Sequence, residues 1–166
     1  MGDDPLREKA QKKAYRLLTL RAHSENELRD KLRAGGFEEA LVASVIEKCR
    51  QLGYLDDGAY ARRRARELAV HRLLGDRRIA ADLAERGIDG EVVREALAEA
   101  RRELSEEAAV EKFLDRKLRG GRAAAMDERL KARLMRGLMG RGFPAGLIYG
   151  KLKKMWEDGF HDDDGE

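Results

Sequence analysis

The sequence contains few of the residue types that staple small folds or anchor a chain in a membrane. A single cysteine, Cys49, cannot form an internal disulfide, so nothing in the chain indicates an oxidising compartment. No apolar run is long enough for a signal peptide or a membrane span. We therefore expect a soluble, cytoplasmic protein.

Metal-binding and catalytic residues are equally scarce. The three histidines, His23, His71 and His161, are far apart, and none has a second ligand at helical spacing, so a zinc site is not expected. The glycines of residues 140–146 follow no strand and lack the spacing of nucleotide-binding fingerprints. The sequence predicts no catalytic residue, no metal and no cofactor, and hence not an enzyme.

The composition favours solvated helices over sheets. Aromatic residues make up 5% of the chain and prolines number two, whereas charged residues reach 40% and hydrophobic residues 42%. The predicted fold class is all-α. The net charge is +3, but removing the eight acidic residues of the two ends leaves residues 5–156 at +11. Such a basic body favours an anionic partner, either a nucleic acid or an acidic protein groove.

One apolar pattern occurs three times along the chain. In each copy, two apolar residues four positions apart are followed five positions later by a third, which comes directly after a glycine. Further apolar residues recur at fixed offsets beyond it. This spacing predicts a helix that ends at the glycine and a second helix after a short turn, as in helix-turn-helix units. The three copies are Leu28, Leu32 and Phe37 with Gly36; Ile79, Leu83 and Ile88 with Gly87; and Leu134, Leu138 and Phe143 with Gly142.

A further helical stretch precedes each pair, over residues 6–21, 57–72 and 106–118, so we expect three tandem three-helix repeats. Ser24 and Glu27 form a capping box, and Gly53 and Asp56 can end one helix and cap the next. The predicted domains are residues 1–55 (repeat 1, with a short acidic N-terminal arm), 56–104 (repeat 2), 105–156 (repeat 3) and 157–166 (an acidic C-terminal tail).

Two segments in order resemble the RecX family of bacterial recombination regulators. They are residues 21–32, Arg-Ala-His-Ser-Glu-Asn-Glu-Leu-Arg-Asp-Lys-Leu, and residues 53–57, Gly-Tyr-Leu-Asp-Asp. Either segment alone occurs in many helical proteins, but the two in this order inside a threefold helical repeat are specific for this family. The resemblance extends over about residues 14–154. The residues that carry this structural motif are Ser24, Glu27, Leu28, Leu32, Gly53, Tyr54, Leu55, Asp56 and Asp57.

The resemblance implies an elongated, curved array of three-helix repeats that lies in the groove of a RecA filament on single-stranded DNA. We expect a monomer, because the apolar stripes of the three repeats can be buried against one another. It implies that filament growth, strand exchange and ATP hydrolysis are restrained, within DNA recombination, DNA repair and the SOS response. The family brings no catalytic residue and no cofactor.

Basic residues cluster most densely in repeat 3, where we expect the anchoring contacts with the filament. The arginine cluster of repeat 2 is as well explained by a salt-bridged solvated face. The expected contact residues are Arg62, Arg63 and Arg66 in repeat 2, and Arg116, Lys117, Arg119, Arg122, Arg129, Arg133, Arg136, Lys151 and Lys154 in repeat 3.

Two alternatives follow from the same residues. Tandem helix-turn-helix units could bind DNA directly, although acidic residues on the second helices argue against duplex readout. Tyr149 and Trp156, seven positions apart, could stack on bases or dock into a partner, but a core stripe with Leu152 is the favoured interpretation.

Overall fold

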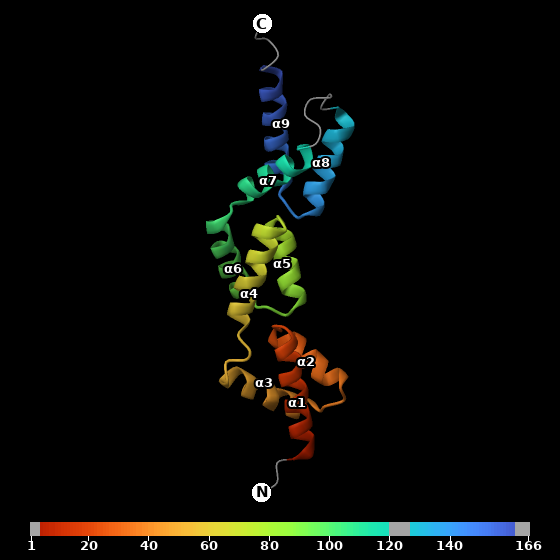
Figure 1. Cartoon of the computed structure of the whole chain (residues 1–166), viewed down its shortest axis with the longest axis vertical. Helices are drawn as coiled ribbons and strands as arrows, with labels where there is room; N and C mark the ends of the chain where they lie inside the picture. Colours follow the sequence, from red (N-terminus) through yellow and green to blue (C-terminus); the bar gives the residue numbers. More distant parts are fainter. Residues whose placement is uncertain (1–3, 120–126, 162–166) are drawn as a thin grey trace. The chain divides into compact units, whose positions relative to one another are not determined.

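The computed structural model describes residues 4–119 and 127–161, which contain helices and no strand. This confirms the all-α prediction. The helices labelled in Figure 1 are α1 (Pro5–Leu20), α2 (Glu25–Ala34), α3 (Glu39–Gln51), α4 (Asp57–Arg66), α5 (Asp76–Glu85), α6 (Gly90–Glu103), α7 (Glu106–Leu118), α8 (Glu128–Gly140) and α9 (Ala145–His161). A further element, η1 (Glu67–His71), follows α4 directly.

Local signals fix the helix ends as the sequence predicts. Ser24 and Glu27 form a reciprocal capping box at the start of α2, and the Ser105 hydroxyl accepts a hydrogen bond from the Ala108 amide at the start of α7. The repeated glycines adopt the left-handed conformation, with φ of 87°, 73° and 89° at Gly36, Gly87 and Gly142.

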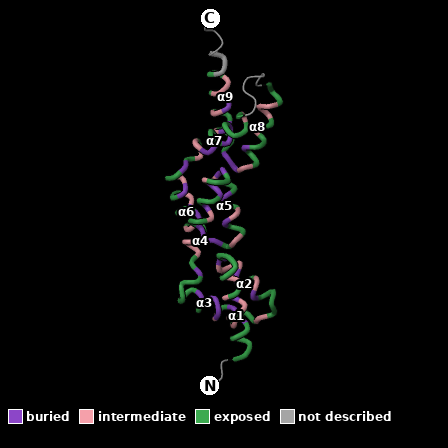
Figure 2. The backbone as a smooth tube through the Cα atoms, in the orientation of Figure 1, coloured by how far each residue is buried: buried purple, intermediate pink, exposed green. Residues whose placement is uncertain are grey.

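The helices group into two compact units. The first comprises the described residues up to Arg64 together with Asp82–Ala96, and the second comprises Ala65–Ala81 and the described residues from Leu97 onward. Repeat 2 therefore contributes residues to both. Figure 2 shows that buried and exposed positions alternate along the helices, as expected for amphipathic helices around a core.

One core cluster of the first unit lies where α1, α2 and α3 pack against one another. Ala10 and Ala14 of α1 are fully buried, which lets this helix approach its neighbours closely. The remaining buried members are Leu28, Leu32, Val42, Val45, Ile46, Cys49 and Leu55. Leu28, Leu32 and Leu55 are motif residues, so part of the motif is explained by the core.

The core of the second unit forms where α9 packs against α7 and α8. Phe113, Leu134, Leu138 and Phe143 are buried there. Leu152 of α9 is also fully buried.

The segment after α4 departs from the sequence prediction. An α-helix was expected over residues 57–72, but α4 ends at Arg66 and continues as the single π-helical turn η1. Leu73 then takes a positive φ of 54°, which is strained for a branched side chain. Its side chain is buried in the core of the second unit, and this burial offsets the strain.

Candidate functional site

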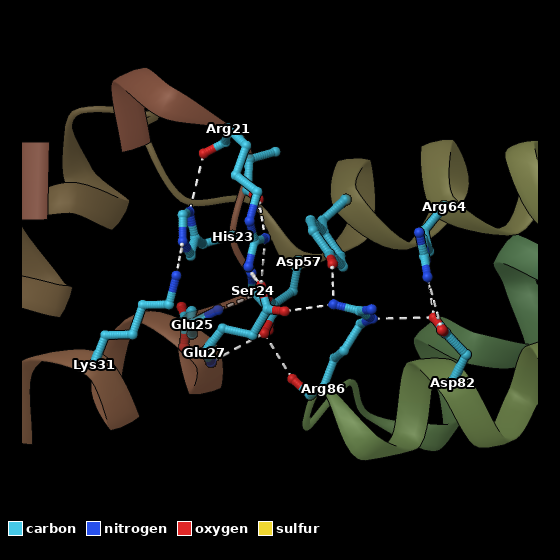
Figure 3. A network of polar contacts seen from close by, with 12 residues as sticks. Arg21, His23, Ser24, Glu25, Glu27, Lys31, Asp57, Arg64, Asp82 and Arg86 are labelled. Atoms are coloured by element: carbon cyan, nitrogen blue, oxygen red, sulfur yellow. Dashed lines mark hydrogen bonds and ion pairs between the residues drawn. The ribbon is translucent and has the colours of Figure 1, made fainter. Parts of the chain in front are cut away.

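The motif residues of repeat 1 meet residues of repeat 2 in a polar joint inside the first unit (Figure 3). The Ser24 hydroxyl accepts a hydrogen bond from the Glu27 amide at 3.1 Å and donates one to the Arg86 carbonyl at 2.6 Å. The Glu27 carboxylate accepts a hydrogen bond from the Ser24 amide at 3.2 Å. The capping box therefore starts α2 and also ties it to the end of α5.

Arg86 is the centre of this joint. Its guanidinium donates to Glu27 at 2.5 Å, to the Tyr60 hydroxyl at 3.1 Å and to Asp82 at 3.0 Å. Asp82 also receives two hydrogen bonds from Arg64, at 2.9 and 2.8 Å. Burial opposes the charge of Arg86, but the hydrogen bond to Asp82 and the nearby negative charges raise its pKa. The hydrogen bond from Arg64 lowers the pKa of Asp82.

Asp57 caps a helix other than its own. Its carboxylate accepts a hydrogen bond from the Glu25 amide at 2.9 Å, in the first turn of α2, whereas Asp56 caps α4 through the Ala59 amide at 3.0 Å. Glu25 in turn receives hydrogen bonds from Arg50 at 2.6 and 2.9 Å. The two adjacent aspartates of the motif thus cap helices of successive repeats.

The same arrangement recurs in the second unit, between repeats 2 and 3. The Asp76 amide, at the start of α5, donates to the Glu106 carboxylate at 2.8 Å, and Arg101 donates to the Asp76 carboxylate at 2.7 Å. Asp76 and Arg101 stand 51 positions after Glu25 and Arg50. Asp76, Arg101 and Glu106 therefore have the roles of Glu25, Arg50 and Asp57, a correspondence that the apolar pattern did not reveal.

Close backbone contact completes this second joint. The Gly75 amide donates to the Arg141 carbonyl at 2.8 Å, and a Cβ at Gly75 would collide with backbone atoms of Gly142 and Phe143. The Arg141 guanidinium donates to the Arg72 carbonyl at 2.6 Å and lies 4.8 Å from the Phe113 ring. Burial and the charges of nearby arginines lower the pKa of Arg141.

His23 is a buried titratable group beside the first joint. Its Nδ1 lies 2.9 Å from the Arg21 carbonyl and its Nε2 lies 2.9 Å from the Lys31 ammonium. Because an ammonium can only donate, Nε2 is the acceptor and Nδ1 carries the hydrogen. Burial lowers the pKa of His23, so the ring is neutral at physiological pH.

The two joints hold successive repeats together. Within residues 4–119 and 127–158, no group of three or more His, Cys, Asp or Glu side chains could hold a metal ion. No helix in the part of the chain that the structure describes is long and apolar enough to cross a membrane.

The predicted contact residues of α8 share one exposed face. Arg129, Arg133 and Arg136 follow spacings of four and three, and all three are exposed, whereas Leu134 and Leu138 on the opposite side are buried. In the part of the chain that the structure describes, none of the three arginines forms an ion pair with a carboxylate within 4 Å.

The other predicted contact residues of repeat 3 differ in whether they already interact with other side chains of the protein. Arg116, Arg119 and Lys154 are exposed, and the Lys117 ammonium lies 5.7 Å from the Phe113 ring. Lys151 donates a hydrogen bond to Glu111. Arg122 lies outside the described residues.

Part of the arginine cluster of repeat 2 is engaged in ion pairs. Arg62, Arg63 and Arg66 are all exposed, and Arg66 makes two hydrogen bonds to Glu103 at 2.7 Å each. The hydrogen bond to Glu103 raises the pKa of Arg66. Together with the Arg64–Asp82 pair, this accounts for part of the cluster as salt bridges.

A groove between α8 and α9 was not predicted. It has a volume of about 310 Å³ and is lined by Lys131, Tyr149, Lys153, Trp156 and Glu157. Tyr149 is 56% exposed, so its assignment to the core is wrong, and Trp156 is half-buried. The two aromatic residues recur one heptad apart and lie beside the buried Leu152 stripe, not within it. Their spacing placed them on one face of α9 but did not show whether a neighbour covers that face.

Comparison with known proteins gives consistent results over most of the chain. Family models described as the first, second and third three-helix domains of RecX match residues 10–49, 56–97 and 105–152. The chain is 37% identical over 146 residues to the regulatory protein RecX of Thermus thermophilus, covering 88% of this chain and 92% of that one. It is 31% identical over 137 residues to the regulatory protein RecX of Syntrophotalea carbinolica, covering 82% and 89%.

A solved structure shares the fold. The crystal structure of RecX from Lactobacillus salivarius superposes with a TM-score of 0.75 at 21% sequence identity, covering 90% of this chain and 96% of that one.

Proposed function

Because the chain belongs to the RecX family of regulatory proteins, we propose that it binds RecA filaments on single-stranded DNA and restrains their growth, ATP hydrolysis and strand exchange. The observation that carries the proposal is the match of all three family domains, in order. Such a regulator acts in the cytoplasm, in DNA recombination, DNA repair and the SOS response.

The basic residues of repeat 3 support an electrostatic contribution to this binding. A filament on DNA presents phosphates and acidic side chains, and a helix face of three exposed arginines attracts such a surface. We assign the main anchoring charge to Arg129, Arg133 and Arg136, because they are exposed together on α8. Arg116, Lys117, Arg119 and Lys154 extend the positive surface, whereas Arg66 and Lys151 contribute less because acidic partners already engage them.

Inhibition of the cognate recombinase tests the proposal. DNA-dependent ATP hydrolysis by RecA should slow when the protein is added below the molar amount of RecA. Unchanged hydrolysis in the presence of a molar excess would remove the proposal.

A charge-reversed variant tests the anchoring face. Replacing Arg129, Arg133 and Arg136 with glutamate should weaken filament binding at low salt, and the difference from wild type should shrink as salt rises because screening increases. The matched control reverses Lys9, Lys12 and Arg16, which are exposed on α1 with spacings of three and four. If both variants bind the filament equally weakly, the loss reflects the change in net charge and not the α8 face. If the α8 variant binds as tightly as wild type, the anchoring contacts lie elsewhere.

Direct DNA binding by the tandem helix-turn-helix units is the alternative function. The helices that would enter the groove of a duplex, α3 and α6, carry exposed acidic residues that phosphates repel, which argues against duplex readout. These residues are Glu38 at the N-cap of α3, Glu39 and Glu47 in α3, and Glu91, Glu95 and Glu99 in α6. Co-sedimentation with single-stranded DNA, with and without recombinase, distinguishes the two functions. Strong enhancement by recombinase is expected of a filament regulator.

A further inference from the structure

The groove between α8 and α9 exposes aromatic side chains that the core does not require. Tyr149 and Trp156 lie seven positions apart, so they share one face of α9 about 10 Å apart along its axis. Leu152 between them is fully buried, which shows that the core stripe of α9 is satisfied without the tyrosine. Tyr149 is 56% exposed, so an aromatic side chain is available to a ligand here.

Positive charge lines the same groove. The Lys131 ammonium lies 5.0 Å from the centre of the Trp156 ring, and Lys153 is on the groove wall contributed by α9. Glu157 is the acidic residue at the groove, and its 3.8 Å pair with Lys153 joins two side chains that are both about two-thirds exposed. A pair this long and this exposed is weak, so Lys153 can exchange it for another anion.

The combination of ring faces and ammonium groups selects one class of ligand. An acidic protein segment would pair with the lysines but would leave the ring faces unused. A nucleic-acid duplex keeps its bases stacked inside the helix. A single strand offers both a phosphate and an unstacked base, and aromatic side chains beside cations are how proteins bind such strands without sequence preference. The volume of about 310 Å³ is at the lower end of the roughly 300–1,000 Å³ of small-ligand pockets, which suits one or two bases.

We propose that this groove binds single-stranded nucleic acid, with a base stacked on Tyr149 or Trp156 and the adjoining phosphates at Lys131 and Lys153. The inference rests on the proposed function for the source of the strand, which is the DNA that the filament carries. It adds a second contact to that function, separate from the α8 arginine face.

Trp156 provides the measurement, because it is the single tryptophan of the chain. Its fluorescence should be quenched when oligothymidylate is added to the full-length protein without recombinase, and the midpoint should move to higher concentration as salt rises. Tyr149→Ala and Lys131→Gln should each weaken binding, the tyrosine variant by about fivefold or more, as expected for loss of one base stack. Tyr54→Ala is the matched control, since Tyr54 is 55% exposed in repeat 1, and it should bind as wild type does.

Two results would overturn the inference. One is quenching by oligothymidylate with the same midpoint in wild type and Tyr149→Ala, provided circular dichroism shows that the variant is folded. The other is quenching by polyglutamate but not by oligothymidylate, which would assign the groove to an acidic protein segment. If the protein slows ATP hydrolysis by RecA but does not bind the oligonucleotide, the groove proposal is wrong and the proposed filament function stands. If it binds the oligonucleotide but does not slow ATP hydrolysis, the filament function is wrong and the groove proposal stands.

Discussion

Replacing Arg86 with alanine removes three hydrogen bonds from the first joint, those to Glu27, Tyr60 and Asp82. Hydrogen bonds to charged groups contribute roughly 1.5–3 kcal/mol each when intact. The total falls well below three such values, because the Arg86 side chain is 26% exposed and Asp82 keeps its two hydrogen bonds from Arg64. We expect the free energy of unfolding to fall by about 2 kcal/mol, within the range for loss of one partner from a partly buried charged network.

Urea denaturation followed by far-ultraviolet circular dichroism measures this change. With a slope of about 2 kcal/mol per molar urea, the midpoint should fall by roughly 1 M. Arg94→Ala is the matched control, because Arg94 pairs with Glu91 where both side chains are about 70% exposed. Its effect should stay below about 0.5 kcal/mol. Equal midpoints for the two alanine variants would show that the Arg86 network does not stabilise the joint.

Three further experiments test other features of the protein. Burial lowers the pKa of His23 in the folded protein, so as pH falls below about 6.5 this histidine takes up a proton in the unfolded chain first, and the free energy of unfolding should fall. The free energy of unfolding should fall less steeply with pH in His23→Asn. Parallel pH profiles for the two proteins, measured by denaturation, would contradict the assigned pKa shift. Gly75→Ala should lower the free energy of unfolding, because the added Cβ would collide with Gly142. Gly150→Ala should raise it by about 0.5–1 kcal/mol, because Gly150 lies within α9 and has open space around it. Changes of the same sign in the two variants would contradict this expectation. Sedimentation equilibrium should give the mass of one chain, and twice that mass would reject the predicted monomer.

Local features of this fold could be predicted because their causes lie within a few positions of one another. The capping box joins residues three positions apart, and a left-handed glycine depends on its own backbone, so Ser24, Glu27 and Gly36 were assigned correctly. The apolar spacing also predicted buried residues in each repeat correctly, except that Phe37 is only partly buried.

The joints could not be predicted because their partners are distant in sequence. Ser24 and the Arg86 carbonyl are 62 positions apart, and Asp57 caps Glu25 from 32 positions away. These contacts depend on how helices of different repeats pack, which periodicity within one helix does not specify. Tyr149 shows a related limit: helical spacing places a residue on a face of its helix, but only packing decides whether a neighbour covers that face.

The cap of α5 has a consequence for how the repeats fold. The residue before this helix, Gly75, has no side chain to cap it and cannot be enlarged, because backbone atoms of Gly142 lie too close. The acceptor for the Asp76 amide is therefore supplied by Glu106, in the first helix of the next repeat, just as Asp57 supplies the one for Glu25. Each of the first two repeats thus completes a helix only after its successor has formed. Such dependence between neighbours makes folding of linear arrays cooperative, so removing the last repeat should loosen the one before it first.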